Sequence, residues 1–470
     1  SVICFLMAIG VNYLLIARIF DGKIAGVTAL LMLLCGLNWQ FAQTGLPQMF
    51  MLLLFSCACF FAYRAVEQTT EGRVALVPAL GAAVFFGLLA LTHWLAIWIV
   101  LGFALYAAFF IRPRGLAGLA ALAAVLLLAI WPMIKNQEYT GRPGGVAMLA
   151  LYNGLGGSED SVMRTYELGN ANLPLENLPF KILRTTLLQA NDLYPYLGSI
   201  LVAPLFFLAL LHPFKRPSIA QFRWCLLLMW AFGALGMSIF GIAKGTTDPN
   251  QLHILFAPLF SAYGLALVAI LWSRLKLPTE VPQLANAHFV AVVLISAGPL
   301  VLDLPRQVRS GLSGGTQFPH WPPYYPSTLN TRLVEFTLEK EIIVSDQPWA
   351  VAWYSDRRSI WLPRKVESLT TFADMADDAG TPVAGILVSP YSHGIQAATR
   401  LYGPRGEYTE FAPLLLDSWV TQTPTLGGGI LTKRDEELRP LLSRYPYPVP
   451  LVGTLLIYWS AESVLETQSR

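Results

Sequence analysis

The polar side chains that could do chemistry lie in the breaks between long apolar runs. Three of them are cations, Lys135, Arg142 and Lys244, and such cations can neutralise a phosphate through charge-assisted hydrogen bonds. Amides, carboxylates and imidazoles accompany them. The full set is Gln43, Gln48, His93, Lys135, Asn136, Arg142, Glu159, Asp160, Lys244, Asp248, Asn250 and His253. These types predict a pocket for a molecule with an apolar tail and an anionic head. A face that only contacts solvent or lipid headgroups is the alternative.

His93 is the sharpest single candidate. It interrupts a run from Val74 to Phe110 that has no Lys, Arg, Asp or Glu, and ionisable groups at membrane depth are functional hypotheses by default. Near an ordinary pKa of about 6.5, an imidazole can exchange a proton or pair with phosphate around neutral pH. A histidine that only caps two short helices is the alternative. His253 is interpreted first as part of a helix start, because Asp248-Pro249-Asn250 precedes it, and second as a pocket residue.

Long apolar segments position these groups. Most are long enough to cross about 30 Å of hydrocarbon, and backbone groups in lipid must be satisfied within the segment, which predicts helices. The run from Val74 to Phe110 is too long for one crossing, so two short helices should meet near His93. The ten predicted segments are 2–19, 24–41, 48–66, 73–91, 93–111, 115–134, 196–212, 222–243, 252–272 and 286–303. The predicted fold class is an α-helical polytopic membrane domain followed by a soluble α/β domain.

The cations between these segments follow an alternating pattern. The odd-numbered breaks carry Lys and Arg, whereas the short even-numbered breaks carry almost none, with Lys244 as the exception. By the positive-inside bias, the odd breaks face the cytoplasm, and residues 304–470 lie outside it. This predicts a multi-pass protein of the inner (plasma) membrane. Because Ser1 would then start outside, we expect at least one further helix upstream of it.

Composition excludes several classes of protein. Only 13% of the residues are charged, against about 25% in soluble domains. The net charge of +3 is too small to indicate a nucleic-acid partner. All five cysteines lie in or beside apolar runs, so no disulfide framework is expected in the exported part. No HExxH, GxSxG or metal-spaced Cys/His cluster occurs. We therefore expect no metal site from this chain alone, and a divalent cation as cofactor stays open.

Two domains follow from the pattern along the chain. Residues 1–303 form the predicted membrane domain, with a large outer loop at 135–195. Within that loop, 178–190 is predicted to be an interfacial helix with Lys181 and Arg184 near the headgroups. A Gly/Pro-rich connector, 304–329, precedes residues 330–470, where strand and helix patterns alternate and favour a parallel or mixed sheet. The expected strands include 342–344, 349–354, 359–363, 383–388 and 451–459, and the expected helices 366–378, 393–402 and 434–444.

Several stretches resemble one family of membrane enzymes. Tyr13 to Glu67 resembles the polytopic GT-C glycosyltransferases of the protein mannosyltransferase and aminoarabinose transferase type. Gly87 to His93 (GLLALTH) is similar to a segment of that family, and Asn136 to Pro143 (NQEYTGRP) to the entry of its large outer loop. The similar stretches occur in the same order as in the family, and the last of them in the membrane domain is Asn250 to Leu265. Residues 346–354, together with residues 361–363, are similar to the exported domain of some bacterial members.

The resemblance implies inverting transfer of a hexosyl or pentosyl unit from a polyprenyl-phosphate donor, on the outer face of the membrane. It also implies an aspartate general base in a loop upstream of Ser1, so the catalytic base is unknown here. Where the family often has a basic residue, an acid after proline, and a lysine, this chain has Gln43, Gln48 and His93. The catalytic candidates are His93, Gln48, Glu159 and Asp160. The candidates for the donor phosphate are Lys135, Arg142 and Lys244, and those for the pocket are Gln43, Asn136, Asn250 and His253.

Two other functions stay open at this point. A transporter of lipid-linked precursors would show charged or broken helices near the midplane and a repeat between halves, and the apolar cores here carry almost no charge. A non-catalytic membrane assembly protein is the second alternative, and the substitutions at Gln43, Gln48 and His93 keep it open. The expected partners are a polyprenyl-phosphate sugar, membrane lipids and a glycan, lipid or protein acceptor, with no nucleic acid.

Overall fold

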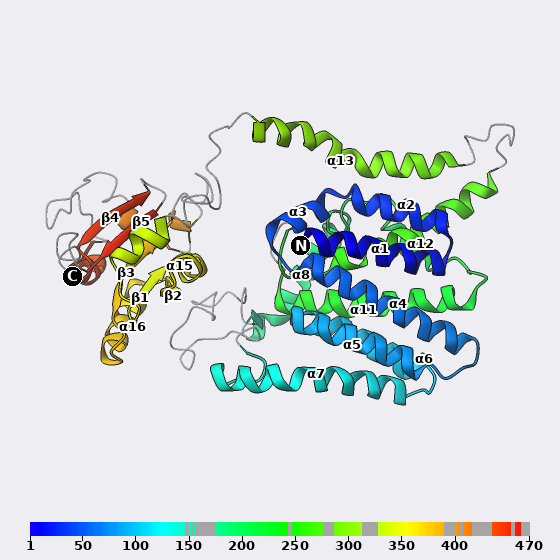
Figure 1. The fold of residues 1–470 in the computed structure, drawn as a ribbon, viewed down its shortest axis with the longest axis horizontal. Coiled ribbons are helices and arrows are strands. Elements are labelled where there is room, and N and C mark those ends of the chain that lie inside the picture. The colour runs from blue at the N-terminus through cyan, green and yellow to red at the C-terminus, as the bar shows by residue number, and fades with distance from the viewer. Residues whose placement is uncertain are drawn as a thin grey trace. The chain divides into compact units, whose positions relative to one another are not determined.

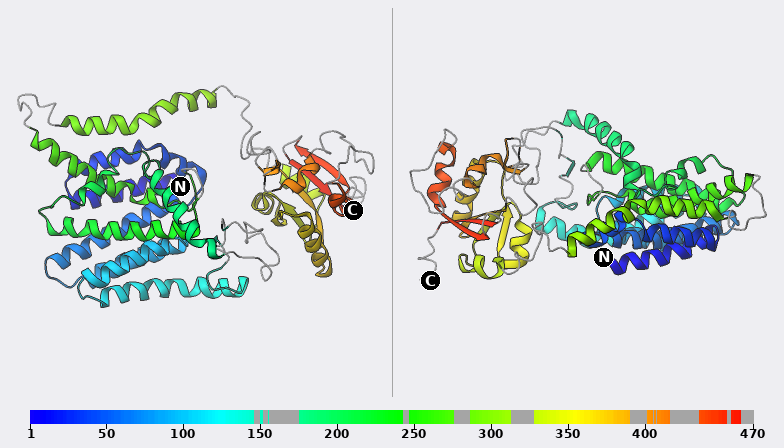
Figure 2. Two further views of the ribbon diagram at one scale, coloured as in Figure 1. Left: turned by 180° about the vertical axis from the view of Figure 1, so that it is seen from behind. Right: turned by 90° about the horizontal axis from the view of Figure 1, so that it is seen from above.

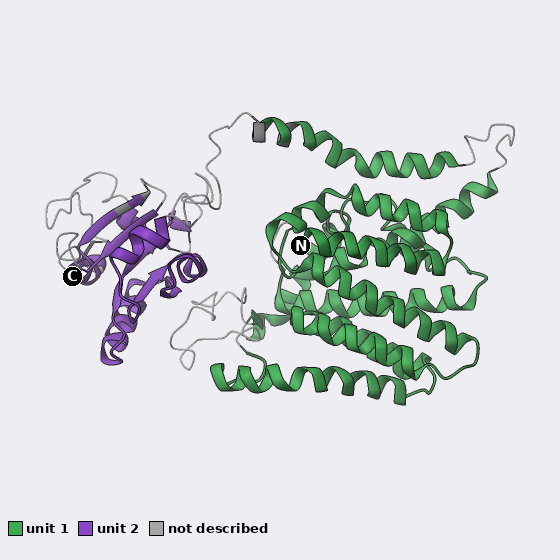
Figure 3. Cartoon of the chain, in the orientation of Figure 1, with its two compact units in different colours: residues 1–163, 172–311 green, residues 164–171, 312–470 purple. Residues whose placement is uncertain are grey.

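The computed structural model describes residues 1–145, 150–151, 155, 175–242, 247–275, 286–312, 328–389, 401–404, 406, 408–415, 435–452 and 456–461. The chain divides into two compact units (Figure 3). Unit 1 comprises residues 1–163 and 172–311, and unit 2 comprises residues 164–171 and 312–470. Each unit is described by itself below.

Unit 1 is a bundle of apolar helices that run side by side (Figures 1 and 2). Its main helices are α1 Val2–Ile19, α2 Gly22–Leu33, α3 Gly36–Thr44, α4 Gln48–Thr70, α5 Leu76–Thr92, α6 Ala96–Phe110, α7 Leu116–Thr140, α8 Leu178–Asn191, α11 Pro217–Phe240, α12 His253–Arg274 and α13 Ala287–Leu312. Shorter pieces are η4 Leu175–Asn177, α9 Leu193–Tyr196 and α10 Leu205–Ala209. Six helices of the described chain are long and apolar enough to cross a membrane, or seven if the α2–α3 pair is one span.

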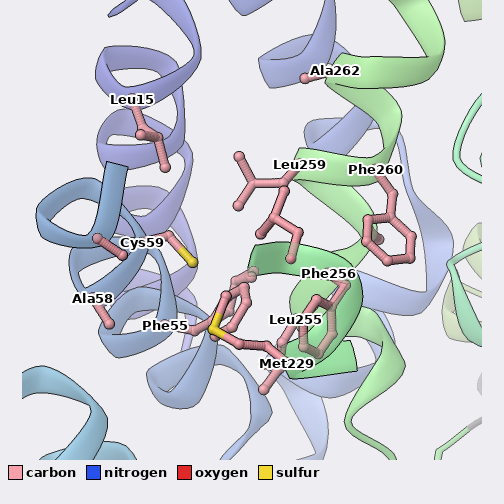
Figure 4. Packing of buried hydrophobic residues seen from close by; sticks show 14 of the residues in the cluster. Leu15, Phe55, Ala58, Cys59, Met229, Leu255, Phe256, Leu259, Phe260 and Ala262 are labelled. Atoms are coloured by element: carbon pink, nitrogen blue, oxygen red, sulfur yellow. The ribbon is translucent and has the colours of Figure 1, made fainter. Parts of the chain in front are cut away.

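Helix α12 lies at the centre of the packing. Every residue from His253 to Leu267 is buried, as expected for a helix that is apolar on all sides and surrounded by other helices. Figure 4 shows Phe55 and Cys59 of α4 facing Phe256 and Leu259 of α12. The rings of Phe55 and Phe256 meet edge to face, with 4.7 Å between their centroids. Large apolar side chains thus fix the position of α12, and with it the polar segment that precedes it.

The two short helices expected around His93 are confirmed. Helix α5 ends at Thr92 and α6 begins at Ala96, so the backbone breaks at residues 93–95. The segment expected at 24–41 differs, because it is split into α2 and α3 with a bend of 56°. The bend lies at Cys35, which packs against Gly198: a Cβ on Gly198 would lie 2.4 Å from the Cys35 sulfur.

The single helix expected over 196–212 is wrong. The structure has only α9, a series of turns and the five-residue α10 in this stretch. Pro204 lies in the middle of the stretch and cannot donate a backbone hydrogen bond within a helix. Gly198 has a φ of +76°, a conformation that ends a helix and that glycine adopts at little cost. Apolarity alone therefore predicted a span that the backbone does not form.

Helix α8 exists where it was expected, but its Lys181 is buried inside the bundle. Lys181, Thr185 and Gln189 are buried, whereas Phe180 and Leu183 are 67% and 57% exposed. Arg184 is exposed as well. A helix that presents apolar side chains outward and polar ones inward is typical of a lipid-facing position beside a polar interior. The expectation that Lys181 contacts headgroups is wrong.

Unit 2 contains a five-stranded mixed sheet in the order β2-β1-β3-β5-β4. Strand β1 pairs in parallel with β2 and β3, while β5 pairs antiparallel with β3 and β4. The strands are β1 Ile342–Ser345, β2 Arg358–Trp361, β3 Val383–Val388, β4 Tyr447–Val452 and β5 Leu456–Ser460, and the helices include η6 Leu329–Leu333, α15 Pro348–Ser355, α16 Val366–Asp378 and α19 Asp435–Arg444. Helices α16 and α19 cover one face and η6 and α15 the other. The expected mixed sheet with helical cover is confirmed.

One expected strand of unit 2 is a helix. Residues 349–354 are continuously apolar, but they belong to α15. The reason is topological, because α15 joins β1 to β2, and neighbouring parallel strands need a crossover rather than a hairpin. Most of the helix expected at 393–402 and most of the connector, residues 313–327, fall outside the described residues.

Candidate functional site

Polar side chains from several helices gather at one end of unit 1, which we call the polar end. We define it by Gln48 at the start of α4, His93 after α5, Lys181 and Gln189 of α8, and Asn250 and His253 at the start of α12. The contacts that follow join these residues through the ends of α4, α8, α11 and α12. The amide and imidazole candidates at the polar end are thus brought together by tertiary structure.

Gln48 ties α4 to the segment before α12. Its side-chain amide donates hydrogen bonds to the carbonyl oxygens of Pro249 and Asp248, at 2.7 Å and 3.3 Å. Gln48 is fully buried. Its Oε1 oxygen is buried without a hydrogen-bond partner in the described part of the chain. Such an atom loses its water without compensation, at a cost of about 1–3 kcal/mol.

Lys181 joins α8 to residues 150–151 and to the end of α11. Its ammonium donates to the carbonyl oxygens of Leu151 at 2.8 Å, Ala150 at 3.3 Å and Phe240 at 3.4 Å. Phe240 is the last residue of α11, where unpaired carbonyls and the helix dipole favour a cation. Burial lowers the pKa of Lys181 from 10.5 to about 8, because a dry environment disfavours the charged form. Lys181 therefore positions residues 150–151 against α11.

His253 belongs to a closed hydrogen-bond network. Its Nδ1 accepts from the Trp230 indole at 3.0 Å, so its Nε2 carries the proton and donates to Oε1 of Gln189, also at 3.0 Å. The Gln189 amide in turn donates to Oγ of Ser238 at 2.8 Å. His253 is fully buried, and both ring nitrogens are used. In this arrangement the imidazole fixes α12 to α8 and α11, and it offers no free atom to a substrate.

Asn250 also bonds within the protein. Its side-chain amide donates to the carbonyl of Gly241 at 3.0 Å. Its backbone N–H donates to Oδ1 of Asp248 at 2.7 Å, a short-range turn typical of aspartate before a helix. These bonds give the segment 247–252 a fixed shape just beyond the end of α11. Asn250 is half-buried, so it lies at the border of the polar end.

Trp94 connects His93 to Phe240, at the end of α11, through aromatic contacts. The ring of His93 stacks on Trp94, with 6.2 Å between centroids, and Trp94 meets Phe240 edge to face at 4.5 Å. The Nδ1 atom of His93 is buried and has no hydrogen-bond partner in the described residues. Burial lowers the pKa of His93 from 6.5 to about 4. His93 is therefore neutral at pH 7, rather than titrating there as expected from an ordinary histidine.

We expect the pKa of His93 to appear in the pH dependence of stability. The unfolded chain takes up this proton near pH 6.5 and the folded chain only near pH 4, so stability should rise with pH across that interval and be flat for this group above it. A shift of this size corresponds to about 3 kcal/mol at most.

The measurement is the thermal midpoint of the purified protein from pH 4.5 to 8, for wild type and His93→Gln. The glutamine variant should show a shallower rise below pH 6.5. Parallel curves for the two proteins would show that His93 titrates normally.

The cationic candidates at the end of α7 make local contacts. Lys135 pairs with Glu138 at 2.7 Å, and its ammonium lies 5.4 Å from the centroid of the Trp131 ring. Asn136 donates to the carbonyl of Pro143 at a long 3.4 Å, and Arg142 is exposed. In the described residues, the structure does not join this group to Gln48 or Lys181.

Gln43 lies at a cavity beside the polar end, because the lining residues Pro195 and Gly198 flank Tyr196, whose ring stacks on that of His253. The cavity has a volume of about 350 Å³, and Gln43 lines it together with Trp39, Ser199, Leu300 and Asp303. This cavity is formed by α3, the turns after α9 and α13. Glu159, Asp160 and Lys244 fall outside the described residues. Among the residues that are described, no three His, Cys, Asp or Glu side chains converge on a possible metal position.

Sequence reasoning missed Lys181 and Gln189 as parts of the site. A signal was present, because Lys181, Thr185 and Gln189 recur every four residues along this helix. That spacing places the three polar side chains on one face. In a lipid-facing helix, such a stripe must point inward, where partners can satisfy it.

Comparisons with known proteins give a limited result. No family model matches the chain, and no curated protein matches it. Two solved structures are similar to this chain. One is the archaeal oligosaccharyltransferase AglB from Archaeoglobus fulgidus, in complex with an inhibitory peptide and a dolichol-phosphate. It is 14% identical at a TM-score of 0.43, and the match covers 83% of this chain and 57% of AglB.

The other is ArnT from Cupriavidus metallidurans bound to undecaprenyl phosphate. It is 12% identical at a TM-score of 0.48, and the match covers 98% of this chain and 83% of ArnT. Both solved proteins are GT-C glycosyltransferases, the family that the sequence motifs resemble. The chain spans little more than half the length of AglB. At these identities, the activity, substrates and partners of the chain are matters for proposal from its own residues.

Proposed function

We propose that this protein is an integral membrane glycosyltransferase, which moves a sugar from a polyprenyl-phosphate donor to an acceptor on the outer face of the membrane. The observation that carries the proposal is the polar end of an otherwise apolar bundle, with two buried polar atoms that have no hydrogen-bond partner among the described residues, Oε1 of Gln48 and Nδ1 of His93. A lipid-linked sugar needs this combination, because its chain is apolar while its sugar offers hydroxyl groups. Both atoms can accept hydrogen bonds from hydroxyls.

The proposed reaction is a direct displacement. A general base removes the proton from an acceptor hydroxyl, whose oxygen bonds to the anomeric carbon as the bond from that carbon to the phosphate oxygen breaks. The free polyprenyl phosphate leaves, and the configuration inverts. The base is unassigned, with a carboxylate upstream of Ser1 and Glu159 or Asp160 as candidates. The proposed contacts of the donor phosphate are Lys135, Arg142 and Lys244. A divalent cation as cofactor is neither required nor excluded by this proposal. Residues 304–470 are proposed to lie outside the cytoplasm.

The interior of the bundle disfavours a transporter. In the described interior of the bundle, Asn12 of α1 donates to Ser56 of α4 at 2.6 Å, a neutral contact. The ion pair between Arg18 and Glu67 of the same two helices lies at their exposed ends. Neither Asn12 nor Ser56 is ionisable, and both are buried among apolar neighbours. A transport path usually places charged or broken helices near the midplane; the α2–α3 pair is broken, but the break at residues 34–35 carries no charged residue. The polar groups here gather at an end instead, as a site at the membrane surface requires.

The test is the conversion of a polyprenyl-phosphate sugar to free polyprenyl phosphate, a product that forms whatever the sugar or acceptor. Membranes that contain the protein would be supplied with hexosyl and pentosyl donors and followed by mass spectrometry. We expect one donor class to be consumed as its sugar appears on an acceptor. If the donor only crosses the vesicle membrane, the protein is a transporter. If no donor is consumed or moved, an assembly role replaces the proposal.

In the same assay, Arg142→Gln should weaken donor binding roughly tenfold, as expected when a charge-assisted hydrogen bond of about 1.5–3 kcal/mol is lost. Arg114 is a matched control, because it is also exposed and lies in the break between α6 and α7, away from the end of α7. Arg114→Gln should bind the donor as the wild type does. Equal donor affinity for both variants would show that Arg142 contacts only solvent or lipid headgroups.

A further inference from the structure

A second cavity lies at the opposite, basic end of unit 1. It has a volume of about 740 Å³ and is formed by the α1–α2 junction, the segment before α11 and the end of α12. Its apolar wall includes Phe20, Phe214 and Ile270, and its cations are Lys215, Arg216 and Arg274. This volume is within the range of small-molecule sites. The cavity takes no part in the proposed sugar transfer.

The three cations have no ion-pair partner among the described residues. Other cations at this end do: Arg18 pairs with Glu67 at 2.7 Å, and Arg73 pairs with Glu71. The acidic residue that lines the cavity, Asp21, already accepts a hydrogen bond from the backbone of Ile24 at 2.8 Å as the cap of α2. The lining therefore carries three cations and one carboxylate, an excess of positive charge.

The apolar wall is held in place independently of any ligand. Phe20, Phe214 and Tyr263 contact one another, with ring centroids 5.1–6.3 Å apart. The buried Arg223 donates to the carbonyl of Ala209 at 3.0 Å and to that of His212, so it fixes the segment that carries Phe214. Fixed apolar walls beside cations make a preformed site for an anion with an apolar part.

We propose that this cavity binds an anionic glycerophospholipid. Its phosphate lies among Lys215, Arg216 and Arg274, and an acyl chain lies along Phe20, Phe214 and Ile270. Basic pockets between membrane helices are suited to anionic headgroups. A free phosphate would satisfy the cations but leave the aromatic wall uncovered, whereas a lipid satisfies both. By contacting all three, the lipid would hold together the start of α2, the start of α11 and the end of α12.

The test is a lipid titration of the purified full chain, followed by native mass spectrometry. Phosphatidylglycerol should bind at least tenfold more tightly than phosphatidylcholine. Each neutralised cation, in the variants Lys215→Gln, Arg216→Gln and Arg274→Gln, should weaken phosphatidylglycerol binding roughly fivefold, as expected for a basic residue beside an anionic lipid. Arg274→Lys should retain most of the binding, which separates loss of charge from loss of fold.

Arg64 and Arg114 provide matched controls. Both are exposed cations at the basic end and lie outside the cavity lining, so Arg64→Gln and Arg114→Gln should bind phosphatidylglycerol as the wild type does. Inorganic phosphate at millimolar concentration should not displace the lipid. The proposal is overturned if the two lipids bind equally, if the control variants lose as much affinity as the cavity variants, or if free phosphate competes fully. None of these outcomes depends on sugar transfer, so the two proposals fail separately.

Discussion

Gly264→Ala is expected to cost the protein about 3 kcal/mol of stability or more, which is the scale for overpacking a core that cannot yield. Gly264 lies in the buried part of α12. A Cβ at this position would lie 2.0 Å from the carbonyl oxygen of Val202 and 2.9 Å from its carbonyl carbon. Both are backbone atoms, so a rotamer change cannot relieve the contact. The turns that replace the expected helix over 196–212 are what bring Val202 so close.

The matched control for this substitution is Gly26→Ala. Gly26 is also in a helix, α2, but it is exposed, and an added Cβ would meet nothing within 4 Å. Alanine has the higher helix propensity, by up to about 1 kcal/mol, so this variant should be as stable as the wild type or slightly more stable. The measurement is the thermal midpoint and folded yield of both variants in detergent. A Gly264→Ala protein that melts with the wild type would contradict the close approach of Val202 to α12.

Lys181→Met is expected to lower sugar transfer at least tenfold while the protein still folds and inserts. The substitution removes the donor that three carbonyl oxygens share, those of Ala150, Leu151 and Phe240. Hydrogen bonds to a charged group contribute about 1.5–3 kcal/mol. Without these hydrogen bonds, residues 150–151 are no longer held against α11, and the residues of the polar end are no longer kept in position. Lys181 acts here as a positioning residue, through the backbone that it holds.

The pH profile distinguishes this role from simple packing. Because the pKa of Lys181 is lowered to about 8 by burial, the wild-type ammonium loses its proton as pH rises through 8, and transfer should fall between about pH 7.5 and 9. Lys181→Arg should retain transfer and flatten that fall, since arginine stays charged. Arg184→Met is the control, because Arg184 is exposed on the same helix. If Arg184→Met loses as much transfer as Lys181→Met, the effect comes from α8 as a whole.

The sequence by itself was sufficient for the features that depend on local pattern. The apolar runs predicted α1, α4, α7, α11 and α12 because a lipid environment leaves a helix as the only way to satisfy the backbone. The uncharged run from Val74 to Phe110 was correctly divided at His93 because of its length. In unit 2, the expected helix 366–378 has the bounds of α16, since its amphipathic period is unambiguous. The candidates Gln48, Asn250 and His253 also lie together at the polar end.

Tertiary structure alone decided the features that depend on what each residue meets. Residues 196–212 are as apolar as a span, yet Gly198 and Pro204 break them where they pack against α3 and α12. Residues 349–354 form a helix because parallel strands β1 and β2 require a crossover. His253 is locked by Trp230 and Gln189, more than 20 and more than 60 residues away, and burial keeps His93 neutral. Lys181 points inward because three distant carbonyls offer it bonds that lipid cannot. Hydropathy is a sum over neighbours in sequence, whereas burial, hydrogen-bond partners and pKa are set by neighbours in space.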